Sequence, residues 1–136
     1  MKGLHTFPTR VYYEDTDAAG IVYYANYLKF AERARTEALR MAGFDQSELM
    51  REHKIGFVVR RCTCDFLKPA RLDDLLTIET HLNDINKVSM NMRQQIRRGS
   101  ETLVTLEVKL AVVGTNGKLA RLPESVRKAM LKVFKG

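Results

Sequence analysis

Hydrophobic residues follow two different periods along this chain. Between residues 27 and 42 they recur every three or four positions, which is the period of a helix that buries one face. Between residues 102 and 113 valine and leucine occupy alternate positions, which is the period of a strand that buries one face of a sheet. The pattern therefore predicts a long amphipathic helix that is followed by strands.

Five strands are predicted in all, from runs of β-branched and aromatic residues that are bounded by turn signals. They cover residues 6–14, 57–67, 75–83, 87–98 and 102–113. Short connections between the last four favour an antiparallel sheet, and one face of so large a sheet must pack against the long helix. This α+β arrangement looks like the hot-dog fold, in which a curved antiparallel sheet of about five strands wraps around a long central helix.

Cap residues mark the ends of the predicted helices. Asn26 is placed to cap the long helix, and Gly43 is placed to end it. Asp45 and Glu48 have the spacing of a capping box, which predicts a short second helix. Residues 125–134 form a basic amphipathic pattern, which predicts a terminal helix.

The composition indicates one ordered domain. The chain has 136 residues, 45% of them hydrophobic, which is enough for a modest core. No linker, internal repeat or low-complexity stretch divides it, so residues 1–136 are predicted to form a single domain. It contains no run of eighteen apolar residues, and its N-terminus lacks the apolar block of a secretory signal. We therefore expect a cytoplasmic protein.

The chain has two cysteines, Cys62 and Cys64, which share one face of a predicted strand. Two residue rises separate them, too far for easy disulfide formation, so we expect buried, reduced and inert thiols. The three histidines are scattered, and no metal-binding motif such as HExxH or a paired CxxC occurs. No metal is expected.

The net charge of +7 suggests an anionic partner. One interpretation is a solvated basic surface; the other is a ligand such as nucleic acid, acidic lipid headgroups or a phosphate-bearing molecule. No helix has a DNA-reading pattern and no aromatic RNA-stacking signature occurs, so nucleic acid is not expected. Peripheral association with an anionic membrane stays open.

The stretch DTDAAGIVYYANY, residues 15–27, places two aspartates and a glycine directly before the long helix. The longer segment YEDTDAAGIVYYANYLKFAERART, residues 13–36, resembles the signature of the 4-hydroxybenzoyl-CoA thioesterase family. It is most similar to the tol-pal-associated acyl-CoA thioesterases of that family, the YbgC type. The segment FVVRRCTCDFLKPARLDDLLTIET is similar to the same branch, so the resemblance covers most of the chain.

The resemblance implies an acyl-CoA thioesterase with a catalytic carboxylate. Thioester hydrolysis needs an oxygen nucleophile, or a base that makes one from water, and donors for the oxyanion. By resemblance Asp17 is the nucleophile, through a mixed anhydride, or the general base, and both routes stay open. The backbone N–H of Tyr24 would polarise the carbonyl, helped by the positive end of the helix dipole. Gly20 would give the loop an unhindered backbone. No cofactor is expected, because CoA is part of the substrate.

Neighbouring residues have other expected roles. Asp15 is expected to be a turn or cap residue, and Tyr23, Tyr27 and Phe30 are expected to pack. Glu32 is the main rival of Asp17, because some hot-dog enzymes place the catalytic carboxylate on the central helix. Its neighbours Arg33 and Arg35 favour an ion pair instead. The YbgC type commonly carries histidine where this chain has Tyr24, whereas the 4-hydroxybenzoyl-CoA enzymes carry tyrosine, so this position bears on substrate choice.

The resemblance also implies where CoA binds and how subunits assemble. Basic residues near the pocket mouth would hold the phosphates of CoA. Lys87 and Ser89 are the first candidates, with Arg60 and Arg121 behind them. Family members pair strands into a dimer and this branch usually forms tetramers, so we expect a homotetramer of dimers with active sites at the dimer interface.

Three alternatives remain beside acyl-CoA hydrolysis. The acyl group could instead be carried by acyl carrier protein, which would then be a partner. A non-catalytic module that binds anionic lipid would explain the charge but would leave the DTDAAG motif unused. A hot-dog dehydratase would need a catalytic histidine, and none lies within residues 13–36.

Overall fold

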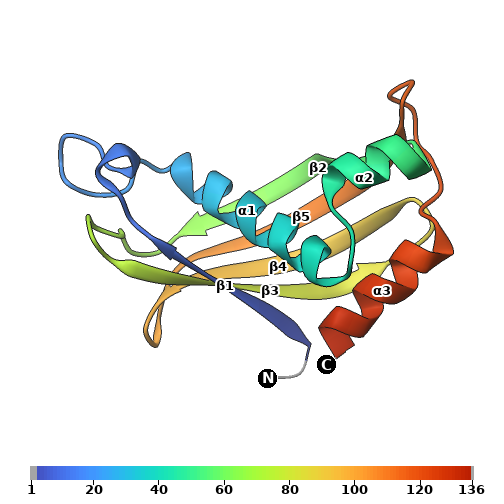
Figure 1. The fold of residues 1–136 in the computed structure, drawn as a ribbon. Coiled ribbons are helices and arrows are strands. Elements are labelled where there is room, and N and C mark those ends of the chain that lie inside the picture. Colours follow the sequence, from blue (N-terminus) through green and yellow to red (C-terminus); the bar gives the residue numbers. More distant parts are fainter. Residues whose placement is uncertain (1–2, 136) are drawn as a thin grey trace.

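A computed structural model describes residues 3–135 of the chain. Five strands form one antiparallel sheet in the order β1-β3-β4-β5-β2 (Figure 1). The strands are β1 (Leu4–Arg10), β2 (Ile55–Phe66), β3 (Leu75–Ile85), β4 (Ser89–Arg98) and β5 (Glu101–Gly114). The helices are α1 (Asn26–Met41), the short α2 (Gln46–Glu48) and α3 (Glu124–Lys135). Within the described residues, none of these helices is long and apolar enough to cross a bilayer.

The long helix α1 lies in the hollow of the curved sheet (Figure 1). It buries Tyr27 and Phe30 near its start and Leu39 near its end. Ala31, Ala34 and Ala38 are fully buried between them, and these small side chains let the helix axis come close to the sheet. On the sheet, buried residues such as Ile78 and Met92 alternate with residues that are mostly half-buried. The predicted amphipathic helix and the hot-dog arrangement are confirmed.

Helix α3 extends the core beyond α1. Its buried residues Val126, Met130 and Phe134 recur every four positions, so they form one face of the helix. This face packs against β1, β3 and α1. Figure 1 shows α3 at the end of the sheet where α1 ends, while the loop before α1 lies at the opposite end.

Two predictions at the start of the chain are wrong. Strand β1 ends at Arg10 because Tyr13–Asp15 form a turn of 3-10 helix, and the Asp15 carboxylate accepts a hydrogen bond from the Tyr12 N–H at 2.8 Å. Asn26 does not cap α1; its side-chain amide donates instead to the Asp15 carbonyl at 2.9 Å. The cap position is taken by Ala25, which has no capping side chain.

The ends of the helices agree better with the sequence. Gly43 follows α1 with a φ of +98°, a left-handed conformation that glycine adopts without strain. The Asp45 side chain caps α2 by accepting from the Glu48 N–H at 2.7 Å, as predicted. The helical chain then continues through one π-helical turn at Leu49–His53.

The cysteines are free thiols in the structure, and the prediction that they are buried is wrong. Cys62 is exposed, Cys64 is half-buried, and their Sγ atoms lie 3.5 Å apart. Strand β2 is an edge strand whose inner face extends past α1, so no element within residues 3–135 covers most of its side chains. The prediction failed because periodicity identifies the inward face of a strand, whereas strand order decides whether anything covers it.

Candidate active site

The DTDAAG motif forms a compact loop between β1 and α1. Asp15 is its buried anchor, since it is only 9% exposed and is held at both ends. Its carboxylate accepts from Tyr12, and its carbonyl accepts from the Tyr23 N–H at 3.0 Å and from the Asn26 amide at 2.9 Å. Asp15 therefore acts as the turn residue that the sequence predicted, and its carboxylate is occupied by the loop itself.

Asp17 lies at the exposed tip of this loop. Its backbone pairs with Ile21, since the Asp17 N–H donates to the Ile21 carbonyl at 2.9 Å. The Gly20 N–H closes the turn by donating to the Asp17 carbonyl at 3.0 Å, and Gly20 has a φ of +79° that other residues rarely adopt. The Asp17 carboxylate accepts only from the Ala19 N–H, at 2.8 Å, among the described residues. One carboxylate oxygen is thus left facing solvent.

The backbone N–H of Tyr24 lies where the loop enters α1. No acceptor within residues 3–135 contacts it, whereas the N–H groups of Val22, Tyr23 and Asn26 are all hydrogen-bonded. Unpaired N–H groups at a helix N-terminus point out of the helix and attract negative charge. This end of α1 can therefore donate a hydrogen bond to an oxygen that approaches from outside.

Aromatic rings line a cleft of about 300 Å³ beside this N–H group. Tyr24 lies just before α1, Tyr27 lies in its first turn, and Phe66 ends β2. The Phe66 ring lies 6.0 Å from the Tyr24 ring and 5.8 Å from the Tyr27 ring. The Tyr24 ring is 61% exposed, so it forms part of the rim, while Tyr27 is buried as predicted.

The segment between β2 and β3 holds the loop from the other side. The Val22 N–H donates to the Ala70 carbonyl at 2.9 Å, and Ile21 pairs with Arg71. The Ala70 N–H in turn donates to the Tyr27 hydroxyl at 2.9 Å. The loop is therefore fixed to a second loop as well as to α1.

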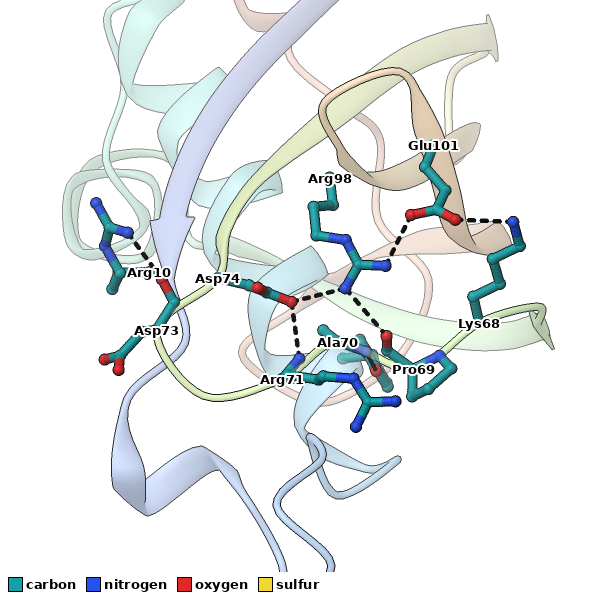
Figure 2. A network of polar contacts seen from close by, with 10 residues as sticks. Arg10, Lys68, Pro69, Ala70, Arg71, Asp73, Asp74, Arg98 and Glu101 are labelled. Atoms are coloured by element: carbon teal, nitrogen blue, oxygen red, sulfur yellow. Dashed lines mark hydrogen bonds and ion pairs between the residues drawn. The ribbon is translucent and has the colours of Figure 1, made fainter.

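Arg98 anchors that second segment to the sheet (Figure 2). Its guanidinium contacts the Asp74 and Glu101 carboxylates, each at 2.7 Å, and the Pro69 carbonyl at 3.3 Å. Lys68 reaches the other oxygen of Glu101 at 2.7 Å. Hydrogen bonds from Lys68 and Arg98 lower the pKa of Glu101 to about 2. The sequence analysis did not predict this network. Asp74 and Arg98 are far apart in the sequence, and only the pairing of β3 with β4 brings them into contact.

Glu32 has a different partner from the one predicted. Its carboxylate accepts from the Thr36 hydroxyl at 2.7 Å, one helical turn later. Neither Arg33 nor Arg35 forms an ion pair with it among the described residues. The ion-pair prediction is wrong because Arg35 turns inward and donates to Gln94 Oε1 at 3.0 Å.

The candidate CoA-binding residues lie far from Asp17 within one chain. Ser89 begins β4, and Lys87 lies in the turn between β3 and β4. Arg121 is brought beside them because the Leu122 N–H donates to the Lys87 carbonyl at 2.7 Å. Arg60 is exposed at the irregular pairing between Val59 and Arg61 on β2. The hydroxyl of Ser89 donates to Asn86 within its own turn at 3.1 Å. The structure thus groups three of these residues at the end of the sheet opposite the loop.

No cluster of three or more potential metal ligands occurs in residues 3–135. The candidate site combines three features: a carboxylate on a tight loop, an unpaired N–H at a helix end and an aromatic cleft. On a hot-dog scaffold these features form a candidate acyl-transfer site, since a free carboxylate has the chemistry of a nucleophile or base and a free N–H has the chemistry of an oxyanion donor.

Comparison with known proteins agrees with this class. Residues 19–105 match the thioesterase superfamily. An acyl-CoA thioesterase named YbgC from Haemophilus influenzae is 43% identical over 91% of this chain and 92% of its own length. A probable thioesterase from Bartonella henselae superimposes with a TM-score of 0.86 at 41% identity, covering 88% of this chain and 99% of the other. A gentisyl-coenzyme A thioesterase superimposes with a TM-score of 0.83 at 31% identity, covering 90% of this chain and 99% of the other. The chain belongs to the thioesterase superfamily.

Proposed function

We propose that this protein is an acyl-CoA thioesterase that hydrolyses an acyl-CoA to the free acid and CoA. One observation carries the proposal. The same loop presents the exposed Asp17 carboxylate and the N–H of Tyr24, which has no acceptor among the described residues. The names of the relatives support the same reaction, since the Haemophilus influenzae protein is called an acyl-CoA thioesterase.

The reaction follows from these two groups. The thioester carbonyl oxygen accepts a hydrogen bond from the Tyr24 N–H, which stabilises the negative charge that develops on that oxygen. Asp17 either attacks the carbonyl carbon or removes a proton from the water that attacks. The acyl–sulfur bond breaks, CoA leaves as its thiol after protonation, and water supplies the oxygen and hydrogens of the products. Through a mixed anhydride, the same water enters in a second step.

We infer that the complete site requires two subunits. Lys87 and Arg121 lie at one end of the sheet and Asp17 at the other, and β4 alone separates these ends by roughly 30 Å. Strand β2 is an edge of the sheet that pairs with only one neighbour among the described residues, and it exposes Val58, Val59 and Phe66. If two β2 edges pair antiparallel about a twofold axis, the Asp17 end of one subunit meets the Lys87 end of its partner. Dimers that stack into a homotetramer complete the proposed assembly.

A panel of acyl-CoA thioesters tests the proposed reaction. The wild-type protein is mixed with acetyl-, butyryl-, octanoyl-, palmitoyl- and benzoyl-CoA, and free CoA is separated and measured. Enzymatic release from at least one of them is the expected result. If none is hydrolysed faster than in buffer while the protein sediments with anionic liposomes, the chain is a lipid-binding module instead.

A further inference from the structure

A second cavity lies between the C-terminal half of α1 and the inner face of the sheet, away from the Asp17 loop. Its volume is about 200 Å³. Most of its wall is apolar and comes from Leu39, Phe57, Met90, Met92, Leu110 and Met130. The volume is many times the roughly 10–15 Å³ that one water molecule needs on the same measure, so the cavity can admit a small ligand.

Arg35 is the cation of this mainly apolar wall, which also contains Glu32 and Gln46 at its exposed side. Its side chain is half-buried and its Nη1 donates to Gln94 Oε1 at 3.0 Å. Gln94 is fully buried, and its Nε2 donates to the Ala31 carbonyl and to the Thr80 hydroxyl, both at 3.0 Å. The guanidinium is therefore held in place by a residue that is itself fixed to both α1 and β3.

The charge of Arg35 is not neutralised by a contact with any residue that the structure describes. No carboxylate oxygen of residues 3–135 lies within 4.0 Å of its nitrogens. Burial lowers the pKa of Arg35, and the nearby charge of Glu32 offsets this only in part. Gln94 occupies one of five guanidinium N–H donors and carries no charge. A partly desolvated cation without an anion gains from binding one, and its planar donors fit a carboxylate.

The geometry points to this cavity as a binding site for a short aliphatic carboxylate, with its anionic end on Arg35 and its chain against the methionines. The flexible thioethers of Met90, Met92 and Met130 adapt to such a chain. Glu32 and Gln46 are exposed members of the wall, so they mark the side from which the ligand enters. The carboxylate is either a free acid or the distal carboxylate of a dicarboxylic acyl group. The second source rests on the proposed thioesterase function and its two-subunit site, because within one chain the cavity lies away from Asp17.

Calorimetric titration with sodium hexanoate tests the site directly. Hexanoate should bind the wild type saturably, and affinity should rise by about fourfold per added methylene from butanoate to hexanoate. Arg35→Met keeps an apolar chain of similar reach but removes the charge, so it should weaken hexanoate binding by at least about tenfold and leave 1-hexanol binding unchanged. Arg33→Met, at an exposed neighbour on α1, is the matched control and should bind hexanoate as the wild type does.

The sign of the charge effect gives a second readout. Glu32→Gln removes a negative charge from the same wall, so it should strengthen hexanoate binding while Arg35→Met weakens it. Equal hexanoate affinity in wild type and Arg35→Met, or no saturable binding by the wild type, would overturn the site. If Arg35→Met does not fold, equal wild-type affinity for hexanoate and 1-hexanol overturns it, and a preference for hexanoate supports it.

Kinetics distinguish the two sources of the carboxylate. If it belongs to the acyl group, Arg35→Met should raise KM for succinyl-CoA and leave KM for butyryl-CoA unchanged, and hexanoate should compete with succinyl-CoA. If it is a free acid, Arg35→Met should change both substrates alike and hexanoate should not compete. Absence of any hydrolysis would contradict the proposed function, but hexanoate binding that depends on Arg35 would still support the site.

Discussion

Two aspartates that are two positions apart have opposite surroundings in this structure. Asp15 is buried, and its carboxylate is used by the Tyr12 N–H. Asp17 is exposed, and its carboxylate accepts only from Ala19 among the described residues. The same sequence motif therefore contains one residue that builds the loop and one that is available for chemistry.

Asp15→Asn tests the structural role. Asparagine can still accept from Tyr12, but without the charge that strengthens this hydrogen bond. We expect the free energy of unfolding to fall by about 1 kcal/mol, with a smaller loss of turnover than Asp17→Asn shows. Urea denaturation of both variants provides the comparison, with Asp17→Asn as the control that should keep wild-type stability. Wild-type stability of Asp15→Asn together with abolished turnover would contradict the assignment.

Lys87 tests the proposed nucleotide contact. If its ammonium binds a CoA phosphate, Lys87→Ala should raise KM for an acyl-CoA severalfold with kcat nearly unchanged. A truncated pantetheine thioester lacks the phosphates, so the variant should hydrolyse it as the wild type does. Steady-state kinetics on both substrates decide the matter, and equal losses on the two would remove Lys87 from the nucleotide site.

At the level of elements, the network around Arg98 ties the segment before β3 to the hairpin between β4 and β5 (Figure 2). That segment holds the Asp17 loop through the hydrogen bond between the Val22 N–H and the Ala70 carbonyl, so loss of the network should loosen the loop. Glu101 is the network member whose ionisation should make stability most dependent on pH. Hydrogen bonds from Lys68 and Arg98 lower its pKa from an ordinary value of 4.5 to about 2.

The direction of that effect can be measured. Between pH 4.5 and about 2, Glu101 is ionised in the folded protein but protonated in the unfolded chain. Its stabilising contribution is therefore present above pH 4.5 and is lost as the pH falls toward 2. Glu101→Gln should show a shallower fall of the unfolding free energy over this range in urea titrations. Glu14→Gln, at an exposed acid with no ion pair among the described residues, should keep the wild-type slope.

Periodicity was sufficient to predict the elements themselves. The long helix and the four later strands follow directly from the spacing of apolar residues, and Gly43 and Asp45 were correctly placed at helix ends. The prediction that Asn26 caps α1 failed because its side chain donates a hydrogen bond to the Asp15 carbonyl instead. The exposure of Cys62 and the inward turn of Arg35 could not be predicted, since both depend on strand order and on contacts between distant residues.

For the whole molecule, the opposite placement of Asp17 and Lys87 makes assembly part of the proposed mechanism. Light scattering at micromolar concentration should give a mass of four times the 15.6 kDa subunit. A mass that corresponds to a hexamer or another assembly would be compatible with the proposed pairing of β2 edges only if that assembly is built from the same dimer. A monomer that hydrolyses acyl-CoA at the full rate would contradict the two-subunit site.

The measurement that tests the central claim most directly is the turnover of Asp17→Asn on a good acyl-CoA substrate. Asparagine keeps the size and the contact with Ala19 but removes the charge that attacks or accepts a proton, so the fold should survive. Turnover should fall by at least about 10²-fold, and by about 10⁴-fold or more if Asp17 is the nucleophile. Glu32→Gln should retain measurable activity. If Asp17→Asn keeps more than about a tenth of the wild-type turnover, well short of the weakest general-base loss, the catalytic carboxylate is not Asp17 and Glu32 becomes the leading candidate.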